Sequence, residues 1–310
     1  MNALVGYTGF VGSNLYERGE FPYAYNSKNI EEAYGLKPDC LVYAGLRAEK
    51  YLANQAPEQD MEMIRQAEAN ITKIDPKKLV LISTVDVLKK TNLADEHTEI
   101  DTEDLQAYGY HRYLLECWVR EHYPDALIVR LPGLFGAHIK KNFIYDYIRR
   151  IPFMIRMEKM VELVMRERAI SDYYEKADNG FYRCRDLDQE ETLQLKKLLG
   201  KAGFSALNFT DSRSRYQFYP LERLWSDIQI ALEHDIRLWH PATEPVSAGE
   251  LYEYLSGETF SNGLSAVPAD YDYRTIYDAV YGGKNGYIMS KQQVMEKIRE
   301  FVQEQTKDEA

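Results

Sequence analysis

The chain has 310 residues, of which 38 are Lys or Arg and 49 are Asp or Glu, so its formal net charge is −11. This balance argues against a protein that binds the phosphate backbone of nucleic acids, because such proteins carry a basic surplus. Hydrophobic residues make up 45% and charged residues 28%, which indicates a globular protein rather than a disordered one. A chain of this length can form one large domain or two coupled ones.

We expect no membrane span, no metal site and a cytoplasmic location. The longest stretch without a polar residue, 40–46, is far shorter than the roughly 20 residues of a membrane helix. No basic region and cleavage site precede the first strand pattern, so we expect no secretory signal. The cysteines are few and scattered, which indicates a reducing compartment, and the histidines form no pair at metal-ligand spacing.

Short apolar strands alternate with helical patterns through the first half of the chain. Met61, Ile64, Ala67 and Ile71 recur at spacings of three and four, which predicts an amphipathic helix over 57–74. This alternation is typical of a parallel sheet covered by helices on both faces. We therefore predict an α/β fold with a doubly wound parallel sheet. Its first strands are expected at 3–6, 22–25, 40–44, 79–83 and 126–131.

The pattern changes after about residue 150. The segment 154–206 is rich in charge and is predicted to be largely helical, with Asp188 placed to cap one helix. Later elements are marked by strand character at 236–239 and by two capping-box spacings, Ser247 with Glu250 and Ser290 with Gln293. We therefore predict that the second half of the chain forms a smaller lobe beside the sheet.

The strongest local signal is the turn Gly6-Tyr7-Thr8-Gly9-Phe10-Val11-Gly12, between the first strand and the first helix. Glycines let a backbone turn tightly and approach a pyrophosphate closely. The helix that follows presents free N–H groups and the positive end of its dipole to an anion. We interpret the turn as a dinucleotide site that uses Gly6, Thr8, Gly9, Phe10, Val11 and Gly12. The alternative is an ordinary glycine-rich turn.

The next cofactor signal is expected about 20 residues after Gly6, where a carboxylate commonly accepts the adenosine ribose hydroxyls. Here Asn26, Ser27 and Lys28 stand instead. No carboxylate at this place repels a 2′-phosphate, and Lys28 can pair with one. The sequence therefore favours NADP slightly over NAD, the alternative being a solvated turn in which Lys28 contacts nothing.

Together these motifs resemble the extended short-chain dehydrogenase/reductase family of NAD(P)-dependent epimerases, dehydratases and reductases, which act mostly on nucleotide sugars. The matching segments, in family order, are the glycine turn with Ser13-Asn14-Leu15, 39–45, 81–84, Tyr108-Gly109-Tyr110-His111-Arg112, 130–136 with 142–144, 218–231 and 242–255. The segment 154–206 is not matched. The resemblance implies a Rossmann-type sheet, with Ala44 and Gly45 also beside the cofactor.

The resemblance also implies how the chain divides. The NAD(P)-binding domain would be 1–150 with a returning segment near 216–256. The substrate-binding lobe would be 151–215 and 257–310, smaller and mostly helical. Family members often pair through the helix that carries the catalytic tyrosine, so a homodimer is implied as well.

The family's Tyr-x-x-x-Lys helix corresponds to Tyr108, with Arg112 in place of the lysine. A tyrosine, whose reference pKa is near 10, needs a neighbouring positive charge to act as an acid/base near neutral pH. Residues four apart share a helix face, so Arg112 can supply that charge, although its planar fork differs from an ammonium. The resemblance makes Tyr108 the acid/base, Arg112 its charge partner and Thr84 the anchor of the substrate oxygen. Alternatively Tyr108 is one of 25 unremarkable tyrosines, and Thr84 merely ends a strand.

The resemblance suggests three substrate-binding residues: Asn142, Arg215 (with Arg213 as its rival) and His138. Asn142 would contact a diphosphate, and an arginine fork fits phosphate oxygens bidentately. His138 stands where epimerase-reductases of GDP-sugars place a catalytic histidine, but Val85 replaces the cysteine that those enzymes use. Val85 and Asp86 also lack the Asp-Glu pair of 4,6-dehydratases, which disfavours dehydration. The alternative for each of the three is a solvated surface residue.

Three functions remain open at this point. The preferred one is an NAD(P)-dependent oxidoreductase or epimerase that acts on a sugar, with a nucleotide-linked sugar as the favoured substrate. The second is a non-catalytic dinucleotide-binding sensor or scaffold, which the Arg112 substitution motivates. The third is a reductase of a small aldehyde or ketone, which the candidate phosphate-binding residues disfavour.

Overall fold

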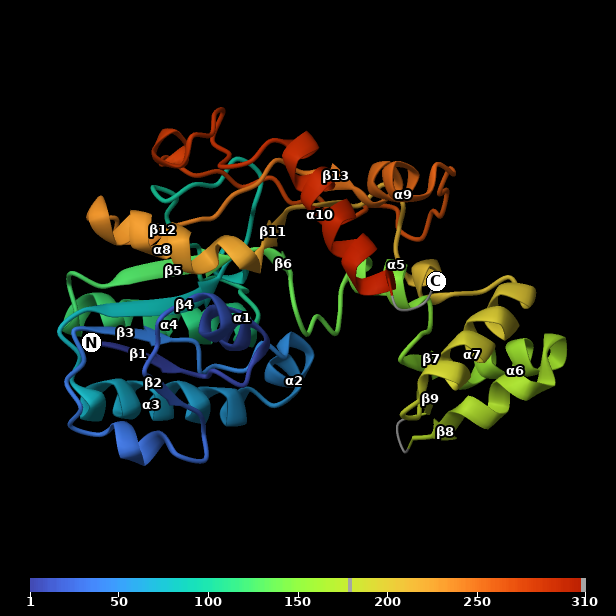
Figure 1. Cartoon of the computed structure of the whole chain (residues 1–310), viewed down its shortest axis with the longest axis horizontal. Helices are drawn as coiled ribbons and strands as arrows, with labels where there is room; N and C mark the ends of the chain where they lie inside the picture. The colour runs from blue at the N-terminus through green and yellow to red at the C-terminus, as the bar shows by residue number, and fades with distance from the viewer. Residues whose placement is uncertain (178–179, 308–310) are drawn as a thin grey trace. The chain divides into compact units, whose positions relative to one another are not determined.

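The computed structural model describes residues 1–177 and 180–307, and the chain forms two compact units. The first unit consists of Met1–Ile139, Arg215–Val246 and Asp270–Ile298. The second unit consists of Lys140–Ser214, Ser247–Ala269 and Arg299–Ala310. Figure 1 shows the course of the chain through both units.

The strands are β1 (Asn2–Val5), β2 (Tyr23–Tyr25), β3 (Cys40–Tyr43), β4 (Leu79–Thr84), β5 (Leu127–Leu131), β6 (Gly133–Phe135), β7 (Met154–Arg156), β8 (Tyr174–Lys176), β9 (Phe181–Cys184), β10 (Arg215–Tyr216), β11 (Phe218–Pro220), β12 (Leu238–Trp239) and β13 (Val246–Ser247). The α-helices are α1 (Phe10–Arg18), α2 (Lys50–Gln55), α3 (Pro57–Ile74), α4 (Ala107–His122), α5 (Phe143–Arg149), α6 (Met157–Arg166), α7 (Gln189–Lys201), α8 (Leu224–Glu233), α9 (Ala248–Ser256) and α10 (Lys291–Thr306). Short 3₁₀ turns include η1 (Ile30–Ala33) and η2 (Val85–Val87).

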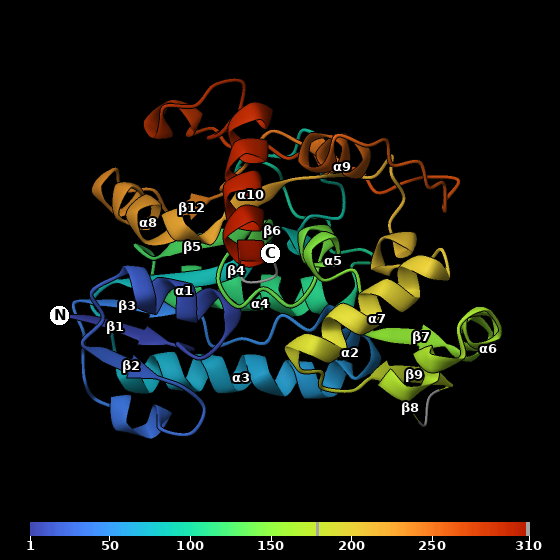
Figure 2. The same cartoon turned by 45° about the vertical axis from the view of Figure 1, so that its right-hand side comes forward.

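The first unit is built on a parallel sheet of six strands in the order β12-β5-β4-β3-β1-β2. The predicted doubly wound parallel sheet is therefore confirmed. The chain leaves β1 for β2 on one side and returns to β3 on the other, so the strand order reverses between β1 and β3. In such sheets ligands bind beyond the carboxyl ends of the strands at this reversal. Figure 2 shows the strands side by side from a second direction.

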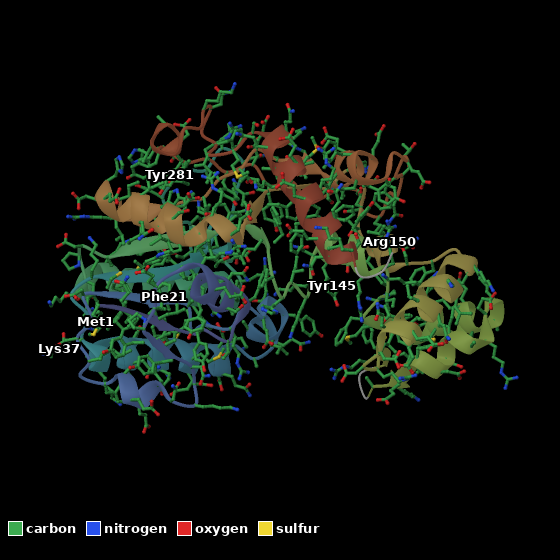
Figure 3. The ribbon with its side chains drawn as sticks, viewed as in Figure 1. Met1, Phe21, Lys37, Tyr145, Arg150 and Tyr281 are labelled. Atoms are coloured by element: carbon green, nitrogen blue, oxygen red, sulfur yellow. The ribbon has the colours of Figure 1, made fainter. Side chains whose placement is uncertain are left out.

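Helices cover both faces of this sheet because the central strands are apolar on both sides. On one face α3 and α4 pack together through Ile64, Ile71, Leu115 and Val119. On the other face α1 packs with α8, and the ring of Phe21, labelled in Figure 3, meets Trp225 at 4.6 Å between centroids. The predicted helix over 57–74 matches α3 at both ends.

The second unit has its own core, formed by α6, α7 and a three-stranded antiparallel sheet in the order β7-β9-β8. The segment 154–206 was expected to be largely helical, and this sheet was not predicted. Its strands have only three or four residues, too few for an alternation of apolar and polar residues to be recognised. The cap that Asp188 was expected to form is present as a full capping box with Glu191. Ser247 and Glu250 form another at the start of α9.

In the part of the chain that the structure describes, no helix is both long and apolar enough to cross a membrane. Within the same residues, no group of three or more His, Cys, Asp or Glu side chains is arranged to hold a metal ion.

Candidate active site

The glycine turn lies at the reversal of strand order. Gly6 has a φ of +94°, and a Cβ there would lie 2.4 Å from the carbonyl oxygen of Ala44, at the end of β3. A Cβ on Gly12 would lie 2.0 Å from the carbonyl oxygen of Gly6. Both positions therefore exclude any side chain, so the backbone itself forms the surface of the turn. Gly9 is the N-cap of α1 and has no side chain to occupy the free first-turn N–H groups, an arrangement that fits a pyrophosphate.

The loop predicted to meet the adenosine ribose lies next to this turn, because the N–H of Gly6 donates to the carbonyl oxygen of Tyr25 at 2.7 Å. Asn26 shapes the loop by accepting the backbone N–H of Lys28 at 2.8 Å. The Lys28 side chain is exposed. The loop thus places an asparagine and a lysine where the sequence predicted them, and the choice between NADP and NAD stays a prediction.

Tyr108 and Thr84 are brought together at the carboxyl end of β4. Gly109 allows this, because a Cβ there would lie 2.1 Å from the carbonyl oxygen of Asp86 in η2. The backbone N–H of Tyr108 donates to Oδ1 of Asn54 at 3.0 Å, which ties the start of α4 to α2. The side chain of Thr84 lies close enough to the Tyr108 hydroxyl to lower its pKa. The proposed acid/base and the proposed oxygen anchor are therefore neighbours at the carboxyl end of β4.

Arg112 is almost fully buried beside the ring of Tyr108. Its Nη1 donates to Oδ2 of Asp60 at 2.6 Å, and its Nη2 donates to the carbonyl oxygen of Arg47 at 2.8 Å. Its guanidinium lies 4.4 Å from the centroid of the Tyr108 ring, over the ring face. Arg112 is thus a charge partner of the ring and also joins α4, α3 and the loop after β3.

Asp60 and its contacts were missed at the sequence level. The carboxylate lies 1% exposed, and Nδ1 of His111 also contacts its Oδ2 at 2.8 Å. A signal existed, because Asp60 precedes Ile64 by four and Ala67 by seven, which puts it on the apolar stripe of α3. A carboxylate on such a stripe needs a buried cationic partner.

Burial raises the pKa of Tyr108 above its ordinary value of 10, and the carboxylate of Asp86 adds to this effect. Arg112, the hydrogen bond with Thr84 and the ammonium of Lys50 all oppose it. The phenol is therefore protonated at neutral pH in the ligand-free protein. In this state it can donate a proton and a hydrogen bond.

Lys50 is a second cation near Tyr108 that no motif indicated. Its Nζ pairs with Oδ1 of Asp86 at 2.6 Å. Burial opposes the charge of Lys50, but Asp86 outweighs it and raises the pKa of the ammonium. The nearest sequence signal was only the position of Lys50 at the start of a short helix.

The predicted substrate-binding residues all have protein partners. Asn142, in the second unit, caps α5 by accepting the backbone N–H groups of Ile144 and Tyr145 at 3.0 and 3.2 Å (Tyr145 is labelled in Figure 3). Its φ is +104°. His138 is exposed, and its Nε2 lies 3.2 Å from a carboxylate oxygen of Glu17.

The two candidate arginines are each paired with carboxylates. Arg215 lies 3.2 Å from Asp270 and 3.6 Å from Asp272. Arg213 binds Asp211 at 2.7 Å and the carbonyl oxygen of Ser265. An incoming phosphate would therefore compete with carboxylates for either guanidinium, and phosphate binding by Arg215 stays a prediction.

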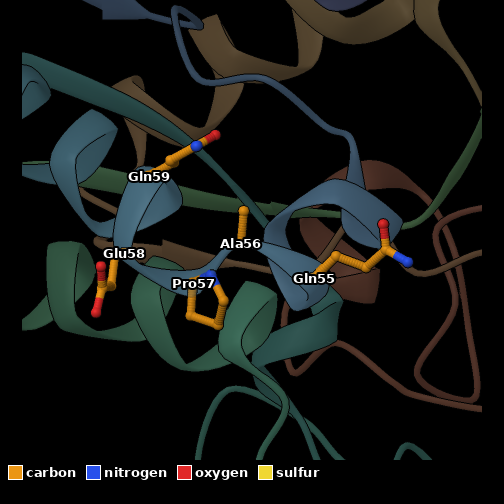
Figure 4. A pocket seen from close by; sticks show the side chains of 5 residues that line it. All are labelled: Gln55, Ala56, Pro57, Glu58 and Gln59. Carbon is orange, nitrogen blue, oxygen red and sulfur yellow. The ribbon is translucent and has the colours of Figure 1, made fainter.

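Two cavities lie apart from the predicted site residues. One, of about 380 Å³, is lined by Gln55, Ala56, Pro57, Glu58 and Gln59 at the junction of α2 and α3 (Figure 4). The other, of about 430 Å³, belongs to the second unit and includes Lys159, Arg166 and Phe204 in its wall. We place the candidate site at the glycine turn and Tyr108 because backbone geometry and hydrogen bonds converge there.

Several solved structures share this fold. UDP-glucose 4-epimerase from Thermotoga maritima, solved with UDP-glucose, aligns with a TM-score of 0.64 at 12% identity over 100% of both chains. The dTDP-4-dehydrorhamnose reductase from Yersinia enterocolitica aligns with a TM-score of 0.62 at 12% identity, covering 97% of this chain and 98% of that one. The same reductase from Bacillus anthracis, in complex with NADP, aligns with a TM-score of 0.61 at 15% identity over 98% and 97%. No family model matches the sequence, and no curated protein matches it. The chain therefore shares the fold of the extended short-chain dehydrogenase/reductase enzymes that act on nucleotide sugars.

Proposed function

We propose that this protein is an NAD(P)-dependent reductase or epimerase of a nucleotide sugar, with Tyr108 as its acid/base. The observation that carries the proposal is the proximity of Tyr108 and Thr84 at the end of β4, in the same unit as a glycine turn that excludes side chains. A dinucleotide turn alone would fit many functions. A phenol and a hydroxyl held together at the carboxyl end of β4 add a place for a carbonyl or hydroxyl of a substrate.

The chain's own residues would divide the work as follows. The backbone of Gly6, Gly9 and Gly12 would hold the diphosphate, with the first-turn N–H groups of α1 directed at it. Thr84 would bind the substrate oxygen, and Tyr108 would give it a proton or take one from it. A bound nicotinamide would supply the hydride chemistry.

The cofactor is proposed to be NADP or NAD, with NADP slightly favoured. Asn26 and Lys28 support the 2′-phosphate, since neither repels it. Structures of the same fold from Bacillus anthracis and Pseudomonas aeruginosa were solved with NADP and NADPH, which supports a nicotinamide dinucleotide as the cofactor. A nucleotide sugar is the proposed substrate because the similar structures include enzymes of dTDP- and UDP-linked sugars.

The alternative is a non-catalytic dinucleotide sensor of the same fold. It is favoured by one observation: the cation four residues after Tyr108 is committed to Asp60 rather than to the hydroxyl. A sensor would bind the dinucleotide and leave every sugar unchanged.

A Tyr108→Phe variant tests the proposal. The variant should lose turnover of a nucleotide-sugar panel while its affinity for NADP(H) and NAD(H) stays nearly unchanged. Tyr110→Phe, on the same helix and exposed, is the matched control and should keep full activity. Equal activity of Tyr108→Phe eliminates the mechanism, and cofactor binding without any turnover in the parent protein supports the sensor.

Location and assembly belong to the same proposal. The three cysteines, Cys40, Cys117 and Cys184, are free thiols, which supports a reducing compartment such as the cytoplasm. A homodimer through α4 is proposed from the family resemblance. Sedimentation of the purified protein would test it, since a monomer at micromolar concentration contradicts it.

A further inference from the structure

The ion pair of Lys50 and Asp86 has no role in the proposed mechanism, although it lies beside the phenol of Tyr108. Lys50 opens α2, and Asp86 lies in η2, two residues after Thr84. The side chain of Lys50 is 46% exposed and that of Asp86 is 26% exposed. The pair is therefore accessible to solvent, unlike the buried pair of Arg112 and Asp60.

Three contacts hold the pair at this place. The close approach of Gly109 to the carbonyl oxygen of Asp86 fixes η2 against α4. Asn54, in the same helix as Lys50, accepts the backbone N–H of Tyr108. The backbone N–H of Asp86 also donates to Oγ1 of Thr84 at 3.1 Å. The start of α2 and the turn after β4 thus meet the start of α4, which carries Tyr108.

The charged and polar groups that face the Tyr108 hydroxyl are Arg112, Lys50, Asp86 and Thr84. A cation favours the phenolate, and a carboxylate favours the neutral phenol. The same ion pair faces a second phenol, Tyr271, whose ring stacks on Tyr216 at 6.2 Å between centroids. The buried Tyr273 also faces Asp86 and Tyr271.

Arg112 and Lys50 differ in what they can do for Tyr108. The guanidinium of Arg112 is buried and bound to Asp60 and to the carbonyl oxygen of Arg47, so its charge is constant. The ammonium of Lys50 pairs with the carboxylate of Asp86 and has a flexible stem that reaches solvent. Of these two cations, Lys50 is therefore the one whose distance from the phenol can change when a ligand binds.

We propose that Lys50 is a positioning residue for Tyr108: the accessible cation that favours its phenolate, held in place and opposed by Asp86. This inference rests on the proposed function, in which Tyr108 moves a proton. Arg112 then supplies a constant background charge and joins α4 to the loop before α2. Lys50 and Asp86 together set how readily the phenol gives up its proton.

The test reads the phenol directly, without any turnover. A fluorinated tyrosine incorporated at position 108 lowers the phenol pKa toward neutrality, and its ¹⁹F chemical shift reports ionisation at that site alone. The titration is recorded in the ligand-free full chain, in Lys50→Met, in Asp86→Asn and in the double variant. Lys77→Met is the matched control, because Lys77 forms a similar 2.6 Å pair with Asp39 at the opposite end of β4.

Opposite shifts are expected. Lys50→Met should raise the phenol pKa by about one, because it removes a cation and leaves Asp86 unpaired, and Asp86→Asn should lower it by a similar amount. The double variant should have a phenol pKa close to that of the parent protein. Lys50→Arg, which keeps the positive charge, should also have a phenol pKa close to the parent value. A purely structural pair would shift the phenol in one direction for both variants, so shifts of the same sign overturn the inference. Shifts no larger than that of Lys77→Met overturn it as well.

Turnover separates this inference from the proposed function. With an active substrate, the pH profile of kcat should move in the same directions as the ¹⁹F titration. A Lys50→Met variant that raises KM and leaves the pH profile in place identifies Lys50 as a substrate contact and overturns the inference. An inactive parent protein with opposite ¹⁹F shifts rejects the proposed function but keeps the electrostatic role of Lys50.

Discussion

The carboxylate of Asp60 accepts a 2.6 Å hydrogen bond from the guanidinium of Arg112, and both side chains are at most 3% exposed. This pair gives the arginine at position 112 a structural role. A planar fork reaches Asp60 and the carbonyl oxygen of Arg47 with two different nitrogens, while its face lies on the ring of Tyr108. An ammonium at position 112 would be a single charged point and would not make this three-way link.

Removing Asp60 should destabilise the protein strongly. Asp60→Ala leaves the buried charge of Arg112 without its carboxylate, which costs about 3–5 kcal/mol in comparable cases. The free energy of unfolding in urea measures the loss. Glu62→Ala is the control, because Glu62 lies on the same helix in an exposed pair with Arg65 and should change stability by less than about 1 kcal/mol. Similar losses in the two variants would contradict the role of the buried pair.

Filling the glycine turn should weaken dinucleotide binding. Gly12→Ala places a Cβ 2.0 Å from the carbonyl oxygen of Gly6, so the turn or the start of α1 must shift. We expect more than about a tenfold loss of NADP(H) affinity and about 1–3 kcal/mol of destabilisation. Isothermal titration with NADPH and urea unfolding check the two effects.

Gly200→Ala is the matched control for that substitution. Gly200 lies inside α7, and a Cβ there meets nothing within 4 Å. Alanine is better than glycine in a helix interior, so this variant should gain about 0.5–1 kcal/mol of stability and bind the cofactor normally. Equal losses of affinity in both variants would show that the effect of Gly12→Ala is not local.

Separating α4 from η2 should impair turnover more than cofactor binding. Gly109→Ala puts a Cβ 2.1 Å from the carbonyl oxygen of Asp86, which forces Tyr108 away from Thr84. A misplacement of about 1 Å can lower a rate by about a hundredfold. We therefore expect kcat to fall by one to two orders of magnitude, roughly, with cofactor affinity retained. Glu121→Ala, exposed on the same helix, should keep kcat, and a Gly109→Ala enzyme with normal kcat would be inconsistent with the proposed site.

His240 should make the first unit sensitive to acid. Burial, reinforced by the charge of Arg130, lowers the pKa of His240 from 6.5 to about 3. Its Nε2 lies 3.3 Å from Nη1 of Arg130, and its Nδ1 lies 3.2 Å from the carbonyl oxygen of Arg274. The folded protein therefore holds the neutral ring, and the corresponding stability is present above pH 6.5 and is lost as the pH falls toward 3.

The free energy of unfolding, measured at several pH values, checks this prediction. Between pH 6.5 and pH 3, this one histidine should lower the free energy of unfolding by roughly 1.4 kcal/mol per pH unit. His240→Gln should flatten this part of the curve, and the exposed His97→Gln should leave it as in the parent. An unchanged slope in His240→Gln would show that another group controls acid unfolding.

Local patterns were enough to predict much of the first unit. The five early strands, α3 and the capping boxes at Asp188 and Ser247 lie where periodicity and cap chemistry indicated. The short strands β7, β8 and β9 were not predicted, because pairing with one another, rather than any pattern within each, makes them strands. The prediction was best where an element's own residues carry the signal.

The candidate site divides in the same way. The glycine turn, Tyr108 and Thr84 were proposed from motifs, and their roles in binding and catalysis stay predictions. The commitment of Arg112 to Asp60 did not follow from any motif, because the two are 52 residues apart.

The sequence by itself determined the parallel α/β architecture, the side-chain-free turn at Gly6 and the phenol at position 108, because each depends on the residue types within one short segment. Only the tertiary structure decided which charges surround that phenol. Lys50 meets Asp86 across 36 residues, and Arg112 meets Asp60 across 52. Such pairs form when helices and strands pack, and the electrostatic energy of a charge depends on the distances and burial that packing creates.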